Sequence, residues 1–334
     1  MKGILLVNLG SPKSTSVKDV RRYLDEFLMD ERVIDLRWFF RSLLVQGIIL
    51  NTRPKKSAEA YKTVWTDQGS PLIVISEQIQ KKLQPLVEVP VSLGMRYEEP
   101  SIETGIRELV AKGVDEIVLL PLYPQYAMST TETVVVKAEE VRAKYFPQVK
   151  LKHVKPFYNR DLYIEVLAKS IQRKLPENFD RLQFSYHGVP ERHIYKTDRT
   201  ETCNLENCRT EGKHHFNEYC YLNHCYETTR LVREKLGLPE EKVGISFQSR
   251  LGKDPWVQPY TDATLAGLPE KGIKNIVVAC PAFVSDCLET LEEISVEGKE
   301  TFLHAGGEQF TYIPCLNDDD DWVQVIKVLC EEIL

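Results

Sequence analysis

The sequence predicts an α/β protein of two Rossmann-like lobes, each with a four-stranded parallel sheet flanked by helices. Three observations lead to this prediction. The chain has 334 residues, enough for about two domains of ordinary size. Eight short apolar runs recur along it, and near-continuous apolar runs are typical of strands buried on both faces of a parallel sheet. Segments with helical patterns follow these runs.

The predicted strands form two sets of four, and the lobe boundary is expected near residues 155–160. We therefore expect a first lobe at 1–155, a second at 156–316 and a C-terminal helix within 317–334 that packs back on the first lobe. Further helices are predicted at 101–112, which begins at the suitable N-cap Ser101, and at 218–236. The strands are predicted at 3–9, 89–95, 116–122 and 150–155, and at 181–187, 243–248, 275–280 and 309–314.

Composition narrows the classes of function. Acidic residues number 49 and basic residues 43, giving a net charge of −6, whereas a nucleic-acid-binding surface needs an excess of basic side chains. No run reaches the ~18 apolar residues of a membrane-spanning helix. The apolar run at the N-terminus is too short for a signal peptide. We expect a cytoplasmic protein that binds no nucleic acid, either a monomer or a homodimer.

The carboxyl ends of the predicted strands indicate where a ligand binds, because ligands of open α/β sheets bind beyond these ends. Two facing lobes would gather them around one cleft. His187 ends a strand, and Gly188 lets the chain turn. An imidazole there is either a metal ligand or base, or a hydrogen-bonded structural histidine. The strand-end segments are 9–12, 96–97, 123–126, 187–188, 248–250 and 281–283.

A row of acidic residues follows the seventh predicted strand. On an α-helix, Asp286, Glu289, Glu293 and Glu297 would share one stripe about 80° wide. Such a stripe is usually a solvated face. Because this helix begins at a strand's carboxyl end, its first acids would point toward the cleft. His187 with a carboxylate such as Glu289 would suit Fe²⁺, and the row could pass protons or ions.

Two other segments allow both a structural and a functional interpretation. Trp256 lies in the segment 246–262, which is either a structural loop or an aromatic wall for a large flat ligand. Residues 37–50 are unusually apolar but too short to span a bilayer. They form either a buried core helix or an exposed lip that takes up a water-insoluble ligand or contacts a membrane.

Four of the eight cysteines are clustered with the spacing C-x4-C-x11-C-x4-C, at Cys203, Cys208, Cys220 and Cys225. In a reducing compartment this spacing favours a metal site over disulfides. The four scattered cysteines are typical of small buried apolar residues.

Several segments resemble signature segments of the ferrochelatase family, in order and over nearly the whole chain. They are NLGSP (8–12), GMRYEEP (94–100), PLYPQYAMSTT (121–131), FSYHGVPERH (184–193), SFQSRLGKDPW (246–256), CPAFVSDCLETLEEI (280–294) and GGEQFTYIPCLN (306–317). The resemblance implies insertion of Fe²⁺ into protoporphyrin IX, with release of two protons, as the last step of haem formation. It also implies a porphyrin cleft between two similar Rossmann-like lobes.

The resemblance also implies roles for individual residues. His187 and Glu289 match the family's metal-site residues, and Asp286 and Glu293 match further acidic positions that would convey ions or protons. The stretch 38–50 resembles the lip of membrane-associated members, so peripheral membrane contact through 37–50 is expected. Porphyrin-pocket positions are matched by Leu9, Arg53, Tyr61, Arg96, Tyr126, Trp256 and Phe283.

The clustered cysteines lie in an insertion, about 198–225, that is absent from simple members of the family. Animal members bind a 2Fe–2S cluster with one cysteine in the PQY-x-x-STT segment, where this chain has Met128, and three near the C-terminus. A subset of bacterial members resembles this chain in placing four cysteines internally. The resemblance implies a 2Fe–2S cluster on Cys203, Cys208, Cys220 and Cys225. Zinc is the alternative, because three histidines lie among them.

Three other functions are compatible with parts of the sequence. They are a two-lobed ligand-binding protein, a chelatase that uses coproporphyrin or another metal, and a structural iron–sulfur or zinc protein. The first leaves the acidic stripe without a role, and the third does not need the pairing of His187 with Glu289. The closeness of NLGSP, SYHGVP and CLETLEEI favours iron as the metal, and the apolar lip favours protoporphyrin as the substrate.

Overall fold

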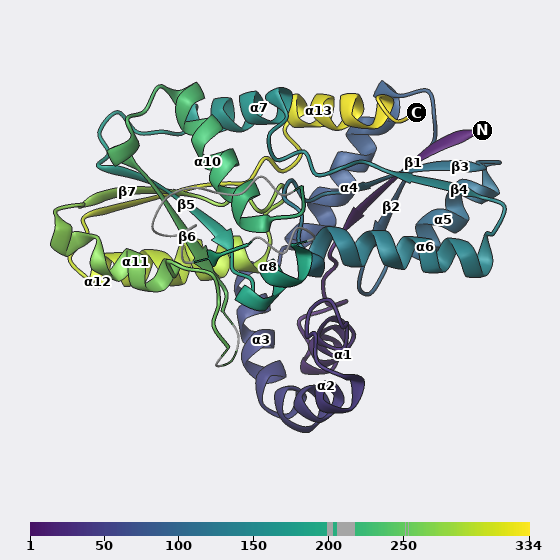
Figure 1. Ribbon diagram of the computed structural model, residues 1–334, viewed down its shortest axis with the longest axis horizontal. Helices are drawn as coiled ribbons and strands as arrows, with labels where there is room; N and C mark the ends of the chain where they lie inside the picture. The colour runs from purple at the N-terminus through teal and green to yellow at the C-terminus, as the bar shows by residue number, and fades with distance from the viewer. Residues whose placement is uncertain (199–202, 206–217, 251, 253) are drawn as a thin grey trace.

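The computed structural model contains two four-stranded, all-parallel sheets, which confirms the predicted fold class (Figure 1). It describes residues 1–198, 203–205, 218–250, 252 and 254–334. The strand orders are β2-β1-β3-β4 and β6-β5-β7-β8, so the same topology occurs twice. The strands are β1 (Lys2–Asn8), β2 (Val91–Met95), β3 (Glu116–Pro121), β4 (Lys150–His153), β5 (Arg181–His187), β6 (Val243–Gln248), β7 (Asn275–Ala279) and β8 (Gln309–Ile313).

Helices cover the sheets, and the carboxyl ends of the central strands face the middle of the molecule (Figure 1). In the first half the helices are α1 (Val17–Leu28), α2 (Trp38–Leu44), α3 (Leu50–Val64), α4 (Pro71–Leu83), α5 (Ile102–Ala111) and α6 (Thr133–Tyr145). In the second half they are α7 (Asp161–Gln172), α8 (Glu191–Thr197), α10 (Tyr221–Leu236), α11 (Thr261–Gly267), α12 (Lys299–His304) and α13 (Asp320–Glu331). Three π-helical segments are η1 (Val45–Ile49), η3 (Met128–Glu132) and η6 (Glu289–Gly298); short 3₁₀ turns are η2 (Gln84–Leu86), η4 (Glu240–Lys242) and η5 (Pro269–Lys271).

The two sheets share one hydrophobic core on the side covered by α4, α7 and α13. This core joins residues of both halves, and α13 packs against both α4 and α7. Trp322 of α13 is fully buried and lies 5.7 Å, ring centre to ring centre, from Phe157. The acidic residues at the start of α13 pair with Lys82 of α4, with Lys169 of α7 and with Arg173, which directly follows α7. The C-terminal helix therefore links the halves on this side.

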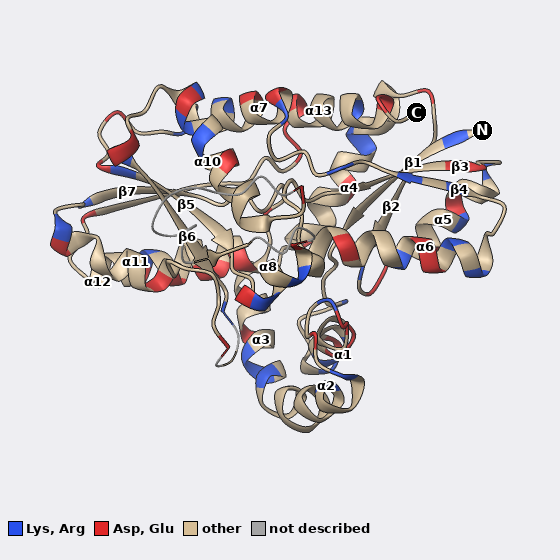
Figure 2. Cartoon of the chain, viewed as in Figure 1, with Lys and Arg blue, Asp and Glu red and all other residues tan. Residues whose placement is uncertain are grey.

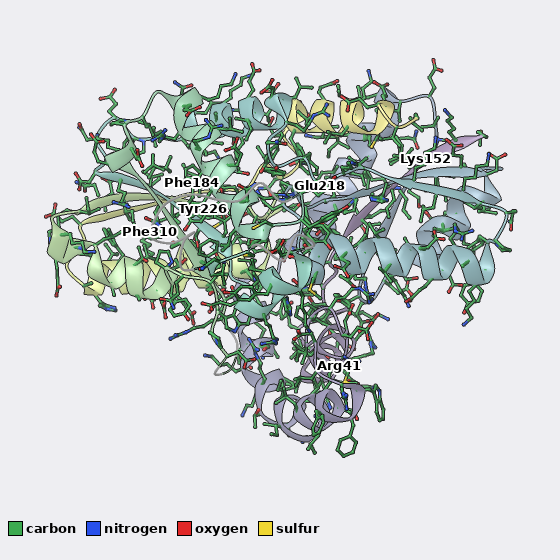
Figure 3. All side chains as sticks on the ribbon, viewed as in Figure 1. Arg41, Lys152, Phe184, Glu218, Tyr226 and Phe310 are labelled. Atoms are coloured by element: carbon green, nitrogen blue, oxygen red, sulfur yellow. The ribbon has the colours of Figure 1, made fainter. Side chains whose placement is uncertain are left out.

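The apolar stretch 37–50 forms an exposed lip and not a buried core helix. With α1 and α3, it makes a helical unit that projects below the two sheets (Figure 1), and few charged residues colour its tip (Figure 2). Arg41, labelled in Figure 3, turns inward and donates hydrogen bonds to the carbonyl oxygens of Ile34 and Leu36. Five apolar side chains are exposed by more than half: Trp38 67%, Phe39 64%, Phe40 57%, Leu43 60% and Ile48 58%.

The acidic row adopts a π-helix, η6, where the sequence predicted an α-helix, so the stripe based on 3.6 residues per turn is corrected. π-Helical turns are rare and frequently lie at functional sites. Along the row, the side chains nevertheless become progressively more exposed to solvent. Asp286, just before η6, is buried, Glu289 and Glu293 are half-buried, and Glu297 is exposed.

A buried carboxylate joins the base of the lip to the second half of the chain. Asp35 precedes α2, and its side chain accepts hydrogen bonds from Arg192, at 2.6 Å, and from Lys196, both on α8. Burial alone would raise the pKa of Asp35, but the hydrogen bonds from Lys196 and Arg192 outweigh it and lower this pKa to about 2. Arg192 also bonds the exposed Asp254, at 2.6 Å.

We predict that Asp35→Asn destabilises the protein in a pH-dependent way. Because the folded state binds fewer protons at Asp35 than the unfolded state, its contribution is present above the unfolded pKa of 3.8 and disappears as the pH falls toward 2. Allowing for solvent screening, the expected loss of unfolding free energy is about 1–2 kcal/mol at pH 7. Urea unfolding at several pH values measures it. Asp254→Asn, the exposed control, should cost at most about 0.5 kcal/mol. An equal loss of unfolding free energy at pH 7 and pH 3 would contradict a contribution that depends on the ionisation of Asp35.

Candidate active site

His187 is the last residue of β5, and one of its ring nitrogens already makes a hydrogen bond. It pairs with Gln248 across the parallel ladder of β5 and β6. Its Nδ1 lies 2.6 Å from the carbonyl oxygen of Gly188. A carbonyl oxygen can only accept, so Nδ1 carries the proton and donates it. The lone pair of Nε2 is therefore left for a proton or a metal ion.

Aromatic side chains lie next to His187. Trp256 is buried against Gly188, where an added Cβ would come within 3.1 Å of the indole ring and 2.8 Å of the Gln248 carbonyl oxygen. Only glycine leaves this space, so the turn after His187 and the position of Trp256 depend on each other. The ring of Phe283, which follows β7, has its centre 6.2 Å from that of His187.

The end of β6 holds the acidic row in place. The Gln248 side-chain amide donates to the main-chain oxygen of Glu289 at 3.2 Å. The main-chain N–H of Ser249, a residue with a φ of +66°, donates to the Glu293 carboxylate at 2.8 Å, and the Ser249 hydroxyl donates to its other oxygen. Two adjacent residues of one strand end thus fix both glutamates.

The electrostatics of Glu293 place it beside His187 and Glu289. Burial raises the pKa of Glu293, and the charge of Glu289 raises it further. The hydrogen bonds from Ser249 and the positive charge that His187 can carry act in the opposite direction, without cancelling the rise. One imidazole and two carboxylates therefore lie within electrostatic reach of one another.

Asp286 occupies a different environment from the two glutamates. Its carboxylate accepts hydrogen bonds from Thr290 at 2.9 Å, Tyr312 at 2.5 Å and the Asn317 side-chain amide at 2.7 Å. It is 5% exposed. These neutral donors occupy both oxygens and tie the start of η6 to the end of β8. The geometry is that of an anchor for the start of η6.

Buried tyrosines from the first half lie within electrostatic reach of Glu289. Burial raises the pKa values of Tyr23, Tyr61 and Tyr123, and the charge of Glu289 contributes to all three rises. Leu288 packs in the same cluster as Leu9 and Tyr61. The hydroxyls of Tyr123 and Ser11 are buried without a hydrogen-bond partner among the residues the structure describes. Sequence reasoning missed Tyr23 and Tyr123, although Tyr123 lies in the strand-end segment 123–126.

Three residues expected in the porphyrin pocket have other surroundings. Arg96 forms an ion pair with the buried Asp30, and its Nε lies 2.6 Å from the Thr133 hydroxyl. Arg53 is exposed on α3. Tyr126 donates its hydroxyl hydrogen to Glu132, at 2.5 Å, and its main-chain N–H to Nδ1 of His224, at 3.1 Å. Of the seven residues expected in the porphyrin pocket, Trp256 and Phe283 lie near His187, and Leu9 and Tyr61 lie near Glu289 or its neighbour Leu288.

The described cysteines do not by themselves form a metal site. Cys220 and Cys225 are buried, Cys203 is half-buried, and Cys208 lies outside the described residues. The described part of the chain contains no group of three or more His, Cys, Asp or Glu side chains that could hold a metal ion. Burial raises the pKa of the Cys225 thiol well above its ordinary value, so without a metal this group stays protonated.

Comparisons with known proteins identify first a class and then a family. Two solved chelatase structures share the fold over 99% of this chain and 96% of theirs: SirB from Bacillus subtilis with Fe³⁺, at a TM-score of 0.54 and 15% identity, and the sirohydrochlorin chelatase SirB from Bacillus subtilis subspecies spizizenii with cobalt, at 0.53 and 12%. The fold is that of the chelatase class.

The family follows from the sequence. The ferrochelatase family model matches residues 1–334. A ferrochelatase from Pseudomonas fluorescens is 49% identical over 98% of this chain and 97% of its own length, and one from Opitutus terrae is 50% identical over 97% and 95%. The chain belongs to the ferrochelatase family, which confirms the resemblance inferred from its motifs.

Proposed function

We propose that this protein inserts Fe²⁺ into protoporphyrin IX at a site between its two halves, with His187 and Glu289 as the residues that handle the metal. Membership of the ferrochelatase family supports the reaction. Two observations support the assignment of residues: His187 Nδ1 is committed to the Gly188 carbonyl oxygen, and both His187 and Glu289 lie within electrostatic reach of Glu293. An imidazole with carboxylates is a donor set that suits Fe²⁺.

The reaction requires two protons to leave as one divalent ion enters. His187 Nε2 would first hold the ion together with Glu289 and, on releasing it to the porphyrin, take one pyrrole proton, because Nδ1 is already protonated. The second pyrrole proton would pass to Glu293. Glu289 would hold the incoming Fe²⁺ while the porphyrin nitrogens replace its other ligands. Two protein ligands suffice for a transient site, because the ion must leave them for the porphyrin.

Protons would leave along the acidic row. The raised pKa of Glu293 brings this carboxyl closer to neutral pH, where it can both accept and release a proton. The next acid, Glu297, is exposed at the far end of η6. Asp286 would fix the position of the start of η6 without exchanging protons, since its oxygens accept hydrogen bonds from Thr290, Tyr312 and Asn317.

Apolar contacts would hold the macrocycle and bend it. A flat porphyrin keeps its nitrogen lone pairs in the ring plane, so bending exposes them to an incoming metal ion, and remote contacts supply the distortion energy. Trp256 and Phe283 beside His187, and Leu9 and Tyr61 beside Glu289, are suitable walls from opposite halves of the chain.

An anaerobic assay with Fe²⁺ tests the function and the substrate together. Haem formation is followed with protoporphyrin IX and with coproporphyrin in parallel. We expect insertion into both porphyrins to depend on Fe²⁺ and the rate to be higher with protoporphyrin, whose two vinyl groups are less polar than the extra propionates. A higher rate with coproporphyrin would reject protoporphyrin as the substrate, and no insertion into either would reject the function.

We propose that the protein is cytoplasmic and that its exposed lip contacts the surface of a membrane. The structure describes no helix with the length and apolar character needed to cross a bilayer. Trp38, Phe40 and Leu43 are each more than half exposed, and aromatic side chains at this density suit insertion into the headgroup region. Such a contact would also bring a water-insoluble porphyrin to the entrance of the site.

We predict that the double variant Trp38→Ser, Phe40→Ser binds lipid vesicles at least ten-fold more weakly, because it removes two of the largest exposed apolar surfaces. Cosedimentation with vesicles of mixed anionic and zwitterionic lipids measures this. Leu162→Ser, on α7, removes an apolar side chain of 43% exposure from outside the lip and should leave binding unchanged. Equal binding by the double variant and the wild type would exclude the lip as the contact.

The clustered cysteines are proposed to bind a 2Fe–2S cluster, with zinc as the alternative metal. The support is their spacing, since the described residues supply only three of the four sulfurs. The proposed insertion chemistry uses none of these cysteines. Metal analysis and an absorption spectrum of protein purified without oxygen distinguish the alternatives: two irons per chain and visible absorption support the cluster, and colourless protein with one zinc excludes it.

A further inference from the structure

Tyr221 contacts the main chain of the proposed metal-site histidine. Its hydroxyl donates to the carbonyl oxygen of His187 at 2.7 Å. Tyr221 is the first residue of α10, and its side chain is 6% exposed. We propose that Tyr221 is a positioning residue that sets the orientation and the tautomer of His187 for the insertion reaction.

The hydrogen bond completes the fixation of one peptide unit. The carbonyl of His187 and the N–H of Gly188 belong to the same peptide group. The N–H donates to the Gln248 carbonyl oxygen at 2.7 Å, and the carbonyl accepts from Tyr221. The peptide plane is therefore held at both ends, by β6 on one side and by α10 on the other.

This peptide unit controls the imidazole through the next carbonyl. His187 Nδ1–H donates to the carbonyl oxygen of Gly188. If the peptide between His187 and Gly188 rotates, that oxygen moves away from Nδ1, and the proton is no longer confined to this nitrogen. Nε2 then carries a proton in part of the molecules, and a protonated Nε2 can accept neither a pyrrole proton nor a metal ion.

The position of Tyr221 on α10 is itself well defined. The Cys220 sulfur accepts the main-chain N–H of Asn223 at 3.5 Å, as an N-cap.

Tyr186 provides a matched control within the same pair of elements. It is the neighbour of His187 in β5, it is fully buried, and its hydroxyl lies 2.9 Å from the hydroxyl of Thr229 on α10. Tyr186→Phe and Tyr221→Phe thus each remove one hydroxyl between β5 and α10. Only Tyr221→Phe removes a contact to the peptide between His187 and Gly188.

The test combines kinetics with the nitrogen spectrum of His187. For Tyr221→Phe we expect kcat for Fe²⁺ insertion to fall about 10- to 100-fold, as for other residues that orient a metal ligand. The KM for porphyrin should stay within about two-fold, because Tyr221 is not proposed to touch the substrate. ¹⁵N NMR of the histidine rings, with His187 assigned by its loss in His187→Ala, should show the Nδ1–H tautomer in the wild type and in Tyr186→Phe. Tyr221→Phe should give a mixture of tautomers.

Two results would overturn the proposal. One is an unchanged His187 tautomer in Tyr221→Phe, whatever its activity. The other is an equal loss of kcat in Tyr186→Phe and Tyr221→Phe, which would indicate a general effect of weakening the packing of β5 on α10. The kinetic part rests on the proposed function, whereas the tautomer is measured without substrate. A wild type with no insertion activity but a tautomer sensitive to Tyr221 would count against the function alone.

Discussion

Replacing His187 with alanine should reduce kcat for Fe²⁺ insertion by about 10²–10⁴-fold, the range that a positioned general base contributes. The variant loses the imidazole whose charge acts on Glu293. It should still fold, because His187 is half-buried and its side-chain hydrogen bond goes to the adjacent carbonyl of Gly188. Initial rates with Fe²⁺ and protoporphyrin IX under anaerobic conditions measure the loss.

The control is His304→Ala, which removes an exposed histidine of α12 far along the chain from β5. It should retain the wild-type rate. Thermal unfolding of both variants should fall within a few degrees of the wild type. A His187→Ala variant that is folded and inserts iron within a factor of about three of the wild-type rate would remove this residue from the mechanism.

Replacing Glu289 with glutamine should lower kcat/KM for Fe²⁺ by about 10²–10³-fold, equivalent to about 3–4 kcal/mol of transition-state stabilisation. The amide has the shape of the carboxylate but no charge to attract a divalent ion. The backbone of η6 should stay in place, because Gln248 bonds the main-chain oxygen of residue 289 and not its side chain. Varying Fe²⁺ at saturating porphyrin separates this loss from an effect on porphyrin binding.

The same substitution has a second, electrostatic consequence. The charge of Glu289 helps to raise the pKa of Glu293, so its removal should lower that pKa toward the ordinary value of a glutamate. Glu297→Gln, at the exposed end of the row, should change kcat/KM for Fe²⁺ by less than about three-fold. If both glutamine variants lose activity equally, the row acts as a whole and Glu289 has no special contact with the metal.

The strands and the location of His187 could be predicted because they depend on local patterns. A buried parallel strand needs a continuous apolar run, and each of the eight runs forms a strand. His187 follows from the rule that ligands bind at the carboxyl ends of such strands. That His187 and Glu289 lie near each other could also be predicted, because the segments after β5 and β7 are expected at the same edge of one sheet.

Other features depend on partners that are distant in the sequence. Asp286 looks like its acidic neighbours, and only the folded chain brings Tyr312 and Asn317 to its carboxylate. Arg96 sits at a strand end as a binding residue would, yet Asp30, 66 residues away, occupies its guanidinium. Local pattern could not identify either partner.

Hydrophobicity alone leaves the lip undecided, and residue spacing predicts the wrong type of helix for the acidic row. The stretch 37–50 is apolar whether it is buried or exposed, and its exposure depends on how α1 and α3 pack. The acidic row was placed on an α-helix by its spacing, but a π-helix also brings residues four apart close to the same face. The hydrogen bonds that select the π form are a property of the folded main chain.

Anomalous diffraction from crystals soaked with Co²⁺, as a stand-in for Fe²⁺, tests the proposed metal site most directly. We expect a peak within bonding distance of both His187 Nε2 and a Glu289 carboxylate oxygen, about 2.0–2.2 Å from each, and its absence from Glu289→Gln crystals. A peak held elsewhere, with His187 and Glu289 both free of metal, would contradict the proposed site.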